Sequence, residues 1–363
     1  MPARLTINLS NLKHNIESMK TKLHSNQEIL AMVKADAYGS GLVETTKYLE
    51  ENGIRNFGVA YLKEAKKLRA AGVKGKIVVF SGILPYEVEE AVNVDAVYSV
   101  SNLEILKDLD KKATSKVKIE IAIDTGMTRL GFAKEELVEL ASTLKTLNNV
   151  EVDGVYTHFS SADVEGKESF TKTQMKLFEE CINILENEGI VIPNKHMDNS
   201  AGIMKYNLDK YNVVRLGISL YGYYPDSMFK SSVNLKGIFK LTAPICNIRT
   251  VGTGHNVSYG GTYTTDKETK IAVLQIGYAD GFVRSLSNNF KVLVNGMEAP
   301  IIGRICMDTC MIDVTGIDVK LGDEAIIFDY DGVKLEEIAN LTNTIHYEII
   351  TTIGKRVDRE YIR

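Results

Sequence analysis

Hydrophobic and polar positions follow two different patterns along this chain, and the change comes near residue 235. Before that point, short apolar runs alternate with longer segments in which apolar residues recur every three or four positions. This pattern indicates strands that alternate with amphipathic helices. The predicted strands cover residues 29–34, 57–60, 77–80, 96–100, 117–124, 152–156, 195–198 and 212–215. The helices expected around them cover residues 10–24, 42–52, 62–71, 135–147 and 170–188.

Short strands separated by helices in this number are typical of a closed (β/α)8 barrel, the TIM barrel. We therefore predict an α/β barrel domain over residues 1–235. The alternative is a doubly wound open sheet. Such a sheet commonly carries a Gly-x-Gly-x-x-Gly segment after its first strand, and none follows the first strand here.

From residue 236 onward the pattern is that of strands joined by turns. The strands expected there cover residues 240–251, 270–276, 290–294, 299–304, 311–314 and 324–328. Asn295 and Gly296 form a strong signal for a two-residue hairpin turn. Only residues 335–341 have a helical pattern, so we predict a mostly β C-terminal domain over residues 236–363.

Composition narrows the class of protein. Apolar residues make up 44% and charged residues 25%, a globular balance, and the net charge of -4 argues against nucleic-acid binding. No apolar run approaches the roughly 20 residues that span a bilayer, and the N-terminal segment lacks the apolar core of a signal peptide. The four cysteines are scattered, which favours reduced thiols and offers no metal site. We expect a cytoplasmic protein without a membrane or nucleic-acid partner.

The first predicted strand is apolar up to its last residue, Lys34. A lysine is rarely buried without a partner, so Lys34 either extends its amine to water or takes part in chemistry. Active sites of α/β barrels lie at the ends of the strands, where Lys34 is expected. The Tyr38 hydroxyl and the backbone amides near Gly39 and Gly41 are suited to an anion. A desolvated lysine beside a phosphate-sized cradle indicates a Schiff base with a phosphate-bearing aldehyde cofactor.

Polar side chains follow other predicted strands as well. Arg129 lies in the loop after residues 117–124, where an arginine is either solvated or donates to a cofactor oxygen or a substrate carboxylate. His158 follows residues 152–156, although a lone histidine is more often structural than catalytic.

The last two barrel strands carry the usual signals of a phosphate site. Barrel phosphate sites use the loops after strands seven and eight, which here contain Ser200 and the amides of Gly217 and Ile218. Arg215 would be a permanent charge inside the barrel and must pair with another group.

Three glycine-rich segments of the C-terminal domain carry polar residues: 256–263 with Tyr259, 276–281 with Tyr278, and 303–308 with Met307. Each alone would be read as a surface loop. Together with residues 33–39, 124–131, 196–202 and 214–222, they resemble the alanine racemase family, in order and along nearly the whole chain. This family consists of pyridoxal 5'-phosphate enzymes with a barrel and a β domain.

The resemblance implies a homodimer whose active sites each take groups from both chains and interconvert L-alanine and D-alanine, a precursor of bacterial peptidoglycan. Lys34 would bind the cofactor covalently and act as one base, and Tyr259 of the partner subunit would be the other. Two bases on opposite faces are what proton removal from one side of Cα and return from the other requires.

Further roles carry over from the family residue by residue. The phosphate would be held by Tyr38, Ser200, Gly217 and Ile218. Arg215 would face the pyridine nitrogen and contact His158, and Arg129 would contact the phenolic oxygen of the cofactor and the substrate carboxylate. A backbone amide for the substrate and an entry corridor would be supplied by Met307, Asp163, Tyr278, Arg284 and Arg304.

Two positions depart from the family pattern. Many members have a carbamylated lysine that binds the arginine equivalent to Arg129, and here that position is Ala122. A pocket tyrosine that meets the cofactor phosphate corresponds to Lys355, whose ammonium could still pair with phosphate. We therefore consider relaxed specificity toward serine as an alternative. A non-catalytic pyridoxal-phosphate carrier, a basic amino-acid decarboxylase and a structural protein rank lower. Carriers lack a second domain, and the characteristic decarboxylase motifs are not evident. A structural protein would leave Lys34 and Arg215 unexplained.

Overall fold

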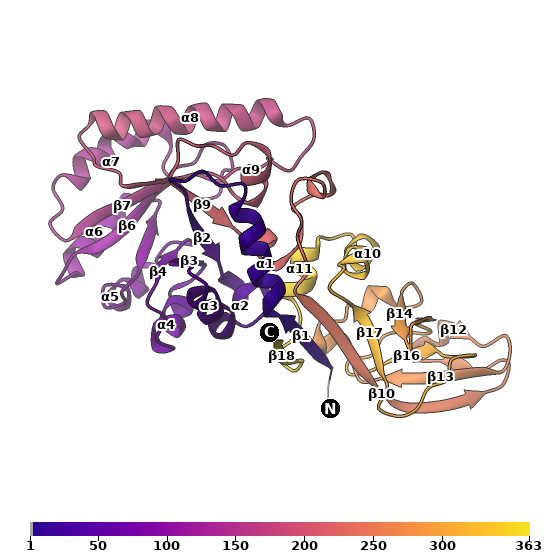
Figure 1. The fold of residues 1–363 in the computed structure, drawn as a ribbon. Helices are drawn as coiled ribbons and strands as arrows, with labels where there is room; N and C mark the ends of the chain where they lie inside the picture. Colours follow the sequence, from indigo (N-terminus) through magenta and orange to yellow (C-terminus); the bar gives the residue numbers. More distant parts are fainter. Residues whose placement is uncertain (1–2) are drawn as a thin grey trace. The chain divides into compact units, whose positions relative to one another are not determined.

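The computed structural model describes residues 3–363. The N-terminal segment, in which no signal peptide was expected, therefore begins two residues outside the described range. Within these residues, eight parallel strands close into a barrel in sequence order (Figure 1). The barrel strands are β2 (Glu28–Met32), β3 (Asn56–Val59), β4 (Lys76–Val79), β5 (Val97–Val100), β6 (Val117–Ala122), β7 (Val150–Tyr156), β8 (Asn194–His196) and β9 (Val213–Leu216). Each lies within a predicted strand or a few residues from it, and the predicted (β/α)8 barrel is confirmed.

Helices follow most of the barrel strands. They are α3 (Leu42–Glu51), α4 (Leu62–Ala70), α5 (Val88–Ala91), α6 (Leu103–Lys112), α7 (Leu137–Leu144), α8 (Glu168–Asn187) and α9 (Ser200–Lys205), and a further helix, α1 (Leu9–Lys20), precedes the first barrel strand. The helices predicted from periodicity are present, whereas α5, α6 and α9 were not predicted. Of these, α6 has the clearest signal, because the Asn102 side chain accepts a hydrogen bond from the Ile105 amide at 2.9 Å and caps the helix.

The described chain divides into two compact units. The barrel unit comprises Lys13–Ala37 and Gly41–Leu235. The β unit comprises residues 3–12, Tyr38–Ser40 and Lys236–Arg363.

A second sheet forms the centre of the β unit. Its strands are β1 (Arg4–Asn8), β10 (Phe239–Val251), β13 (Thr269–Leu274), β14 (Lys291–Val294), β15 (Met297–Pro300), β16 (Cys310–Asp313), β17 (Glu324–Phe328) and β18 (Asp358–Ile362). The N-terminal strand β1 was not predicted, and it pairs with β10 and, in parallel, with β18. The mostly β character of the C-terminal segment is confirmed.

Two expectations for this segment were wrong. The strand expected at residues 299–304 begins earlier, as β15, because the left-handed residues Asn295 and Gly296 make a tight turn directly after β14. The helix α10 (Val333–Leu341) is not the only helix there, since α11 (His346–Thr351) follows it. A helix of only six residues is too short to show a full amphipathic period.

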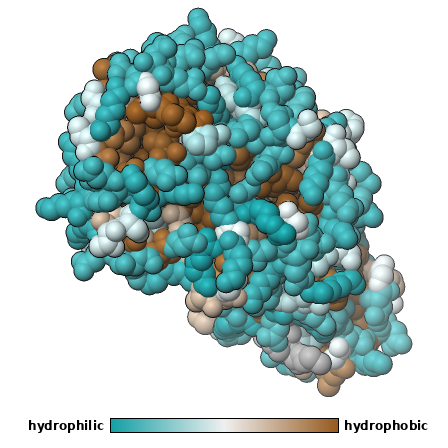
Figure 2. All heavy atoms as spheres, turned by 60° about the vertical axis from the view of Figure 1, so that its left-hand side comes forward, coloured by the Kyte–Doolittle hydropathy of each residue, from teal (hydrophilic) through white to brown (hydrophobic). Residues whose placement is uncertain are grey.

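Apolar side chains fill the interiors of both units. Large side chains that are fully buried include Phe57, Tyr98 and Phe178 in the barrel unit and Phe239 and Phe328 in the β unit. Figure 2 shows that hydrophilic side chains cover most of the visible face and that hydrophobic ones gather in recesses between them. No helix among residues 3–363 is both long and apolar enough to cross a membrane.

Candidate active site

The backbone after Lys34 is strained. Lys34 follows the barrel strand β2 and begins the short segment α2 (Lys34–Tyr38). Its next four residues, Ala35, Asp36, Ala37 and Tyr38, have φ angles of 54, 55, 52 and 54°. This is a left-handed turn made of residues other than glycine, which costs roughly 1–2 kcal/mol per residue. The surrounding contacts must compensate for this cost.

Two carboxylates hold the turn by accepting hydrogen bonds from backbone amides. The Ala35 amide donates to Oε1 of Glu64 at 2.8 Å. Oδ1 of Asp36 accepts from the Leu42 amide at 3.0 Å, and its carbonyl accepts from the Gly41 amide at 2.9 Å. From the sequence we expected only backbone amides near Gly39 and Gly41 that suit an anion, so the left-handed turn and the contacts of Glu64 were both missed.

Tyr38 is buried and belongs with Gly39 and Ser40 to the β unit. Gly39 has a φ of 85°, and a side chain at this position would overlap the carbonyl group of Ile350. The Ser40 carbonyl accepts a hydrogen bond from the Tyr361 hydroxyl at 2.8 Å. These contacts fix the backbone after Tyr38 within the β unit.

The electrostatic surroundings of Lys34 favour a neutral amine. Burial lowers the pKa of Lys34, and the positive charges of Arg129 and Arg215 lower it further. The carboxylate of Glu64 opposes this shift without reversing it. A lysine has to be deprotonated to act as a nucleophile or a base, so this environment prepares Lys34 for both.

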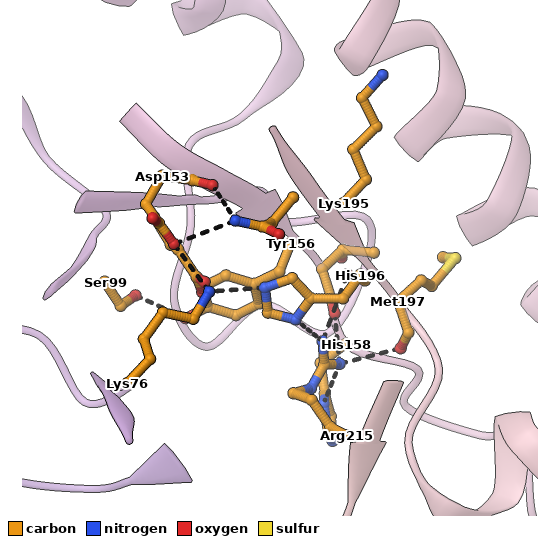
Figure 3. Close-up of polar contacts among 12 residues, drawn as sticks. Lys76, Ser99, Asp153, Tyr156, His158, Lys195, His196, Met197 and Arg215 are labelled. Atoms are coloured by element: carbon orange, nitrogen blue, oxygen red, sulfur yellow. Dashed lines mark hydrogen bonds and ion pairs between the residues drawn. The ribbon is translucent and has the colours of Figure 1, made fainter. Parts of the chain in front are cut away.

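Arg215 is buried in β9 and is held by four neighbours (Figure 3). Its Nη1 donates to Nδ1 of His196 at 2.7 Å. Its Nη2 donates to the carbonyls of Thr157 at 2.7 Å and Met197 at 2.9 Å, and to Nδ1 of His158 at 3.1 Å. The Nε–H group forms no hydrogen bond with any of residues 3–363, so it is available to a ligand. Burial lowers the pKa of Arg215 to about 10, which leaves it charged near neutral pH.

Behind Arg215, a buried histidine and a buried carboxylate continue the chain of hydrogen bonds. Because Arg215 can only donate, Nδ1 of His196 accepts, and its Nε2–H donates to Oε2 of Glu120 at 2.9 Å. The His196 ring stacks on Tyr156 with centroids 5.2 Å apart. Glu120 lies on β6 two residues before Ala122, and alternation along the strand puts both on one face. The Glu120–His196 pair was not predicted from the sequence.

His158 and Arg129 contribute in different ways. The contact between His158 and Arg215 that the resemblance implied is present, and burial and the nearby cations lower the pKa of His158 well below its usual value. It is therefore a neutral acceptor. Arg129 is exposed, in a loop that Oδ1 of Asp124 holds through the amides of residues 126–128 at 2.9, 3.0 and 3.1 Å.

Of the residues predicted to hold a phosphate, those other than Tyr38 lie after two neighbouring barrel strands, β8 and β9. Ser200 is the first residue of α9, after Asn199, whose side chain caps this helix by accepting from the Gly202 amide at 3.0 Å. Oγ of Ser200 accepts a hydrogen bond from the Gly217 amide at 3.1 Å. The next residue, Ile218, is buried at the start of a short 3-10 helix. The structure thus brings Ser200 and Gly217 into direct contact.

Tyr259 lies in a second strained loop, in the β unit. Its side chain is 71% exposed. The preceding residue, Ser258, has φ 64° and ψ -174°, a region that is normally open only to glycine. The Ser258 hydroxyl donates to the carbonyl of Arg304 at 2.6 Å, and the two glycines after Tyr259 have φ angles of 72° and 52°.

Apart from Asp163 in the barrel unit, the other predicted residues lie in or near three β-unit segments that are hydrogen-bonded to one another. The amides of Tyr278 and Ala279 donate to the carbonyls of Cys306 and Met307, both at 3.0 Å, and the Gly354 amide donates to the Asp280 carbonyl at 2.8 Å. Exposed side chains among the predicted residues are Tyr278, Arg284, Met307 and Lys355, whereas Arg304 and, in the barrel unit, Asp163 are half-buried.

Comparison with known proteins identifies the family. The model of the alanine racemase N-terminal domain matches residues 7–225, and that of the alanine racemase C-terminal domain matches residues 238–361. The chain belongs to the alanine racemase family. Membership makes it an enzyme of the racemase class.

Individual members agree along the full length. The alanine racemase of Methanococcus maripaludis is 41% identical, with 99% of each chain covered. That of Desulforamulus reducens is 39% identical, again with 99% of each chain covered. The structure of the Clostridium difficile 630 alanine racemase has a TM-score of 0.95 at 36% identity and covers 100% of this chain and 96% of its own. The Bacillus anthracis alanine racemase with bound L-Ala-P has a TM-score of 0.94 at 34% identity, with 100% and 95% covered.

Within this family fold, the barrel unit contributes a compact cationic centre. The charges of Arg129 and Arg215 lower the pKa of both Lys34 and His158, so the two arginines lie within electrostatic reach of these side chains. Such a centre is suited to an anionic ligand that carries a nitrogen acceptor and an aldehyde.

Proposed function

We propose that this alanine racemase family member interconverts L-alanine and D-alanine with pyridoxal 5'-phosphate as cofactor and Lys34 and Tyr259 of the partner subunit as the two bases. The observation that carries the proposal is the centre formed by Lys34 and Arg215. The lysine has a lowered pKa and is followed by strained backbone, and the buried arginine has one donor, Nε–H, without an acceptor among residues 3–363.

The residues of this chain fit the proposed cofactor. Lys34 would hold it covalently, and the Nε–H of Arg215 would donate to its pyridine nitrogen. The Ser200 hydroxyl and the backbone at Gly217 and Ile218 would hold its phosphate, together with Tyr38. When bound, the cofactor withdraws electrons from an attached amino acid and so acidifies the hydrogen on Cα.

Arg215 has a second task in this scheme. An arginine keeps its proton near neutral pH, so it keeps an acceptor nitrogen opposite it unprotonated. The electron-withdrawing power of the cofactor is then moderate, which disfavours return of the proton to a carbon other than Cα. The hydrogen bonds from Arg215 to His158 and His196 fix the guanidinium plane for this task.

The two bases exchange the Cα proton from opposite sides. Lys34 in its neutral form accepts the proton on one face, and the phenol of Tyr259 of the partner subunit delivers a proton to the other face. In the reverse direction the roles exchange. Arg129 and the Met307 amide would orient the substrate carboxylate. Asp163, Tyr278, Arg284 and Arg304 would line the entry corridor.

The remaining parts of the proposal concern the assembly and the cell. We propose a homodimer with shared active sites, because the exposed Tyr259 needs a partner site in which to act. The domains would be residues 1–235 and 236–363. The enzyme would be cytoplasmic and would supply D-alanine for peptidoglycan.

A relaxed specificity for serine is the second candidate. It is favoured by Ala122, which cannot be carbamylated, and by Lys355 in place of a pocket tyrosine. Its test is the ratio of kcat/KM for L-alanine and L-serine, and a strong exclusive preference for alanine would refute it.

One experiment addresses the proposal as a whole. The purified protein is incubated with pyridoxal 5'-phosphate and reduced with borohydride, and the modified peptide is identified by mass spectrometry. We expect the label on Lys34 and, without reduction, loss of optical rotation from L-alanine. Labelling without racemisation would instead indicate a carrier protein, and labelling of another lysine would contradict the proposal.

A further inference from the structure

Three helices of the barrel unit begin with the same kind of glutamate cap. In each, a glutamate at the third position of a helix accepts the backbone N–H of the residue before that helix, which caps it. Oε2 of Glu87 and Oε2 of Glu136 do so at 3.0 and 2.6 Å. Oε2 of Glu64 accepts the Tyr61 amide at 3.1 Å in the same way.

Glu64 differs from the other two in what else it binds. Its Oε2 also accepts the amide of Ala60 at 2.8 Å, and its Oε1 accepts the amide of Ala35 at 2.8 Å. Glu64 is 9% exposed, whereas Glu87 is half-buried and Glu136 is exposed. One buried carboxylate therefore joins the start of α4 to the residue directly after Lys34.

The position of Ala35 gives this contact its significance. Ala35 is the first left-handed residue of α2, and its amide belongs to the peptide that carries the Lys34 carbonyl. A bond to that amide fixes the orientation of the peptide at the point where the chain enters a strained conformation. Since left-handed residues other than glycine are unfavourable in isolation, this bond offsets part of their cost.

We propose that Glu64 is a positioning residue for Lys34. Glu64 holds the left-handed turn that follows Lys34 and so sets the direction in which the Lys34 amine points. The inference rests on the proposed function only where it concerns cofactor attachment.

The charge of Glu64 acts on the same amine. Around Lys34, the cations of Arg129 and Arg215 lower its pKa together with burial, and Glu64 raises it. Without Glu64 the pKa of Lys34 would therefore fall further. Glu87, which caps another helix, is not among the charges that shift the pKa of Lys34, and this separates Glu64 from an ordinary cap.

The experiment compares Glu64→Gln with Glu87→Gln as the matched control. An amide has one acceptor oxygen in place of two and no charge, so each variant weakens a helix cap, and only Glu64→Gln also frees Ala35. The pKa of Lys34 is measured in the cofactor-free protein by competitive labelling with a small amine-reactive reagent across pH, followed by mass spectrometry. Cofactor affinity, kcat and thermal unfolding are measured in parallel.

We expect both variants to unfold at a somewhat lower temperature than the parent. Only Glu64→Gln should lower the labelling midpoint of Lys34, weaken cofactor binding and reduce kcat, the last by about 10- to 100-fold as for a misplaced reacting group. In a Glu64→Gln, Ala35→Gly double variant, we expect thermal stability to recover and the midpoint to stay low, because glycine relieves the strain without restoring the charge.

Equal behaviour of Glu64→Gln and Glu87→Gln would overturn the inference. If Glu64→Gln does not fold, the double variant provides the labelling midpoint, and an unchanged midpoint there would have the same meaning. Failure of the proposed function is distinguishable, because it would appear in the parent protein as absent racemisation while the labelling result still tests Glu64.

Discussion

Lys34 and Tyr259, the two proposed bases, lie in different units, and both adjoin strained backbone. Lys34 precedes a run of left-handed residues that are not glycine, and it is half-buried. Tyr259 follows one strained serine and precedes two glycines, and it is 71% exposed. The first loop is therefore held by contacts, whereas the second relies largely on residues that tolerate its conformation.

The difference shows how each base obtains its environment. The barrel unit supplies the burial, the cations and the carboxylate that act on Lys34. The loop of Tyr259 supplies a direction and an exposed ring, as expected for a group that acts in another subunit. Lys34 obtains the environment it needs as a base from its own unit, whereas Tyr259 would obtain its environment only when two subunits assemble.

Replacement of Lys34 is expected to have the largest effect. Lys34→Ala should abolish covalent attachment of the cofactor and lower racemisation by at least about 1,000-fold, since both the attachment point and one base are lost. The measurement is absorbance of the purified protein together with polarimetry on L-alanine. A Lys34→Ala variant that still shows an aldimine band, loses that band on borohydride reduction and racemises alanine would contradict the role of Lys34.

Replacement of Tyr259 should slow racemisation without weakening cofactor binding. Tyr259→Phe should slow proton removal from L-alanine by about 100- to 1,000-fold while leaving cofactor affinity close to that of the parent, because the phenyl ring keeps the shape and loses the proton. The effect is measured with L-alanine deuterated at Cα, for which the isotope effect should increase. Equal loss of cofactor binding and rate would show that Tyr259 is structural.

Replacement of Ser258, the strained residue before Tyr259, should have a smaller effect on activity. Ser258→Gly should relieve the backbone strain and lose the hydrogen bond to the Arg304 carbonyl. We expect a more mobile loop and a kcat lowered several-fold, with thermal stability unchanged. Ser258→Ala keeps the strain without the bond and should unfold more easily. Identical kinetics of parent and glycine variant would mean that the serine does not orient Tyr259.

The smallest effect concerns pH. Because burial and neighbouring cations lower the pKa of Lys34, its amine is neutral at a lower pH than that of an ordinary lysine. Competitive labelling should therefore reach its midpoint at Lys34 below the midpoint of lysines in unstructured model peptides. A midpoint at or above theirs would contradict the environment described for Lys34.

Much of this architecture could be predicted from the sequence, because strands and helices leave periodic patterns of apolar residues. Alternating strands and helices indicate a barrel, and a barrel places strand ends such as Lys34 and Arg215 at one face. The left-handed turn could not be predicted, because Ala35 and Asp36 carry no signal for it. The turn is held by Glu64, which lies in α4, after the next barrel strand. The Glu120–His196 pair depends on strand register, which is visible only once the barrel closes.

The shared active site can be tested directly with mixed dimers. Lys34→Ala and Tyr259→Phe chains, each expected to be nearly inactive with L-alanine, are combined, dissociated and reassociated. A mixed dimer has one site with both bases and one with neither, so random pairing should restore about a quarter of the parental activity. Activity no greater than the sum of the two variants, in samples shown to contain mixed dimers, would contradict the claim that Lys34 and Tyr259 meet across subunits.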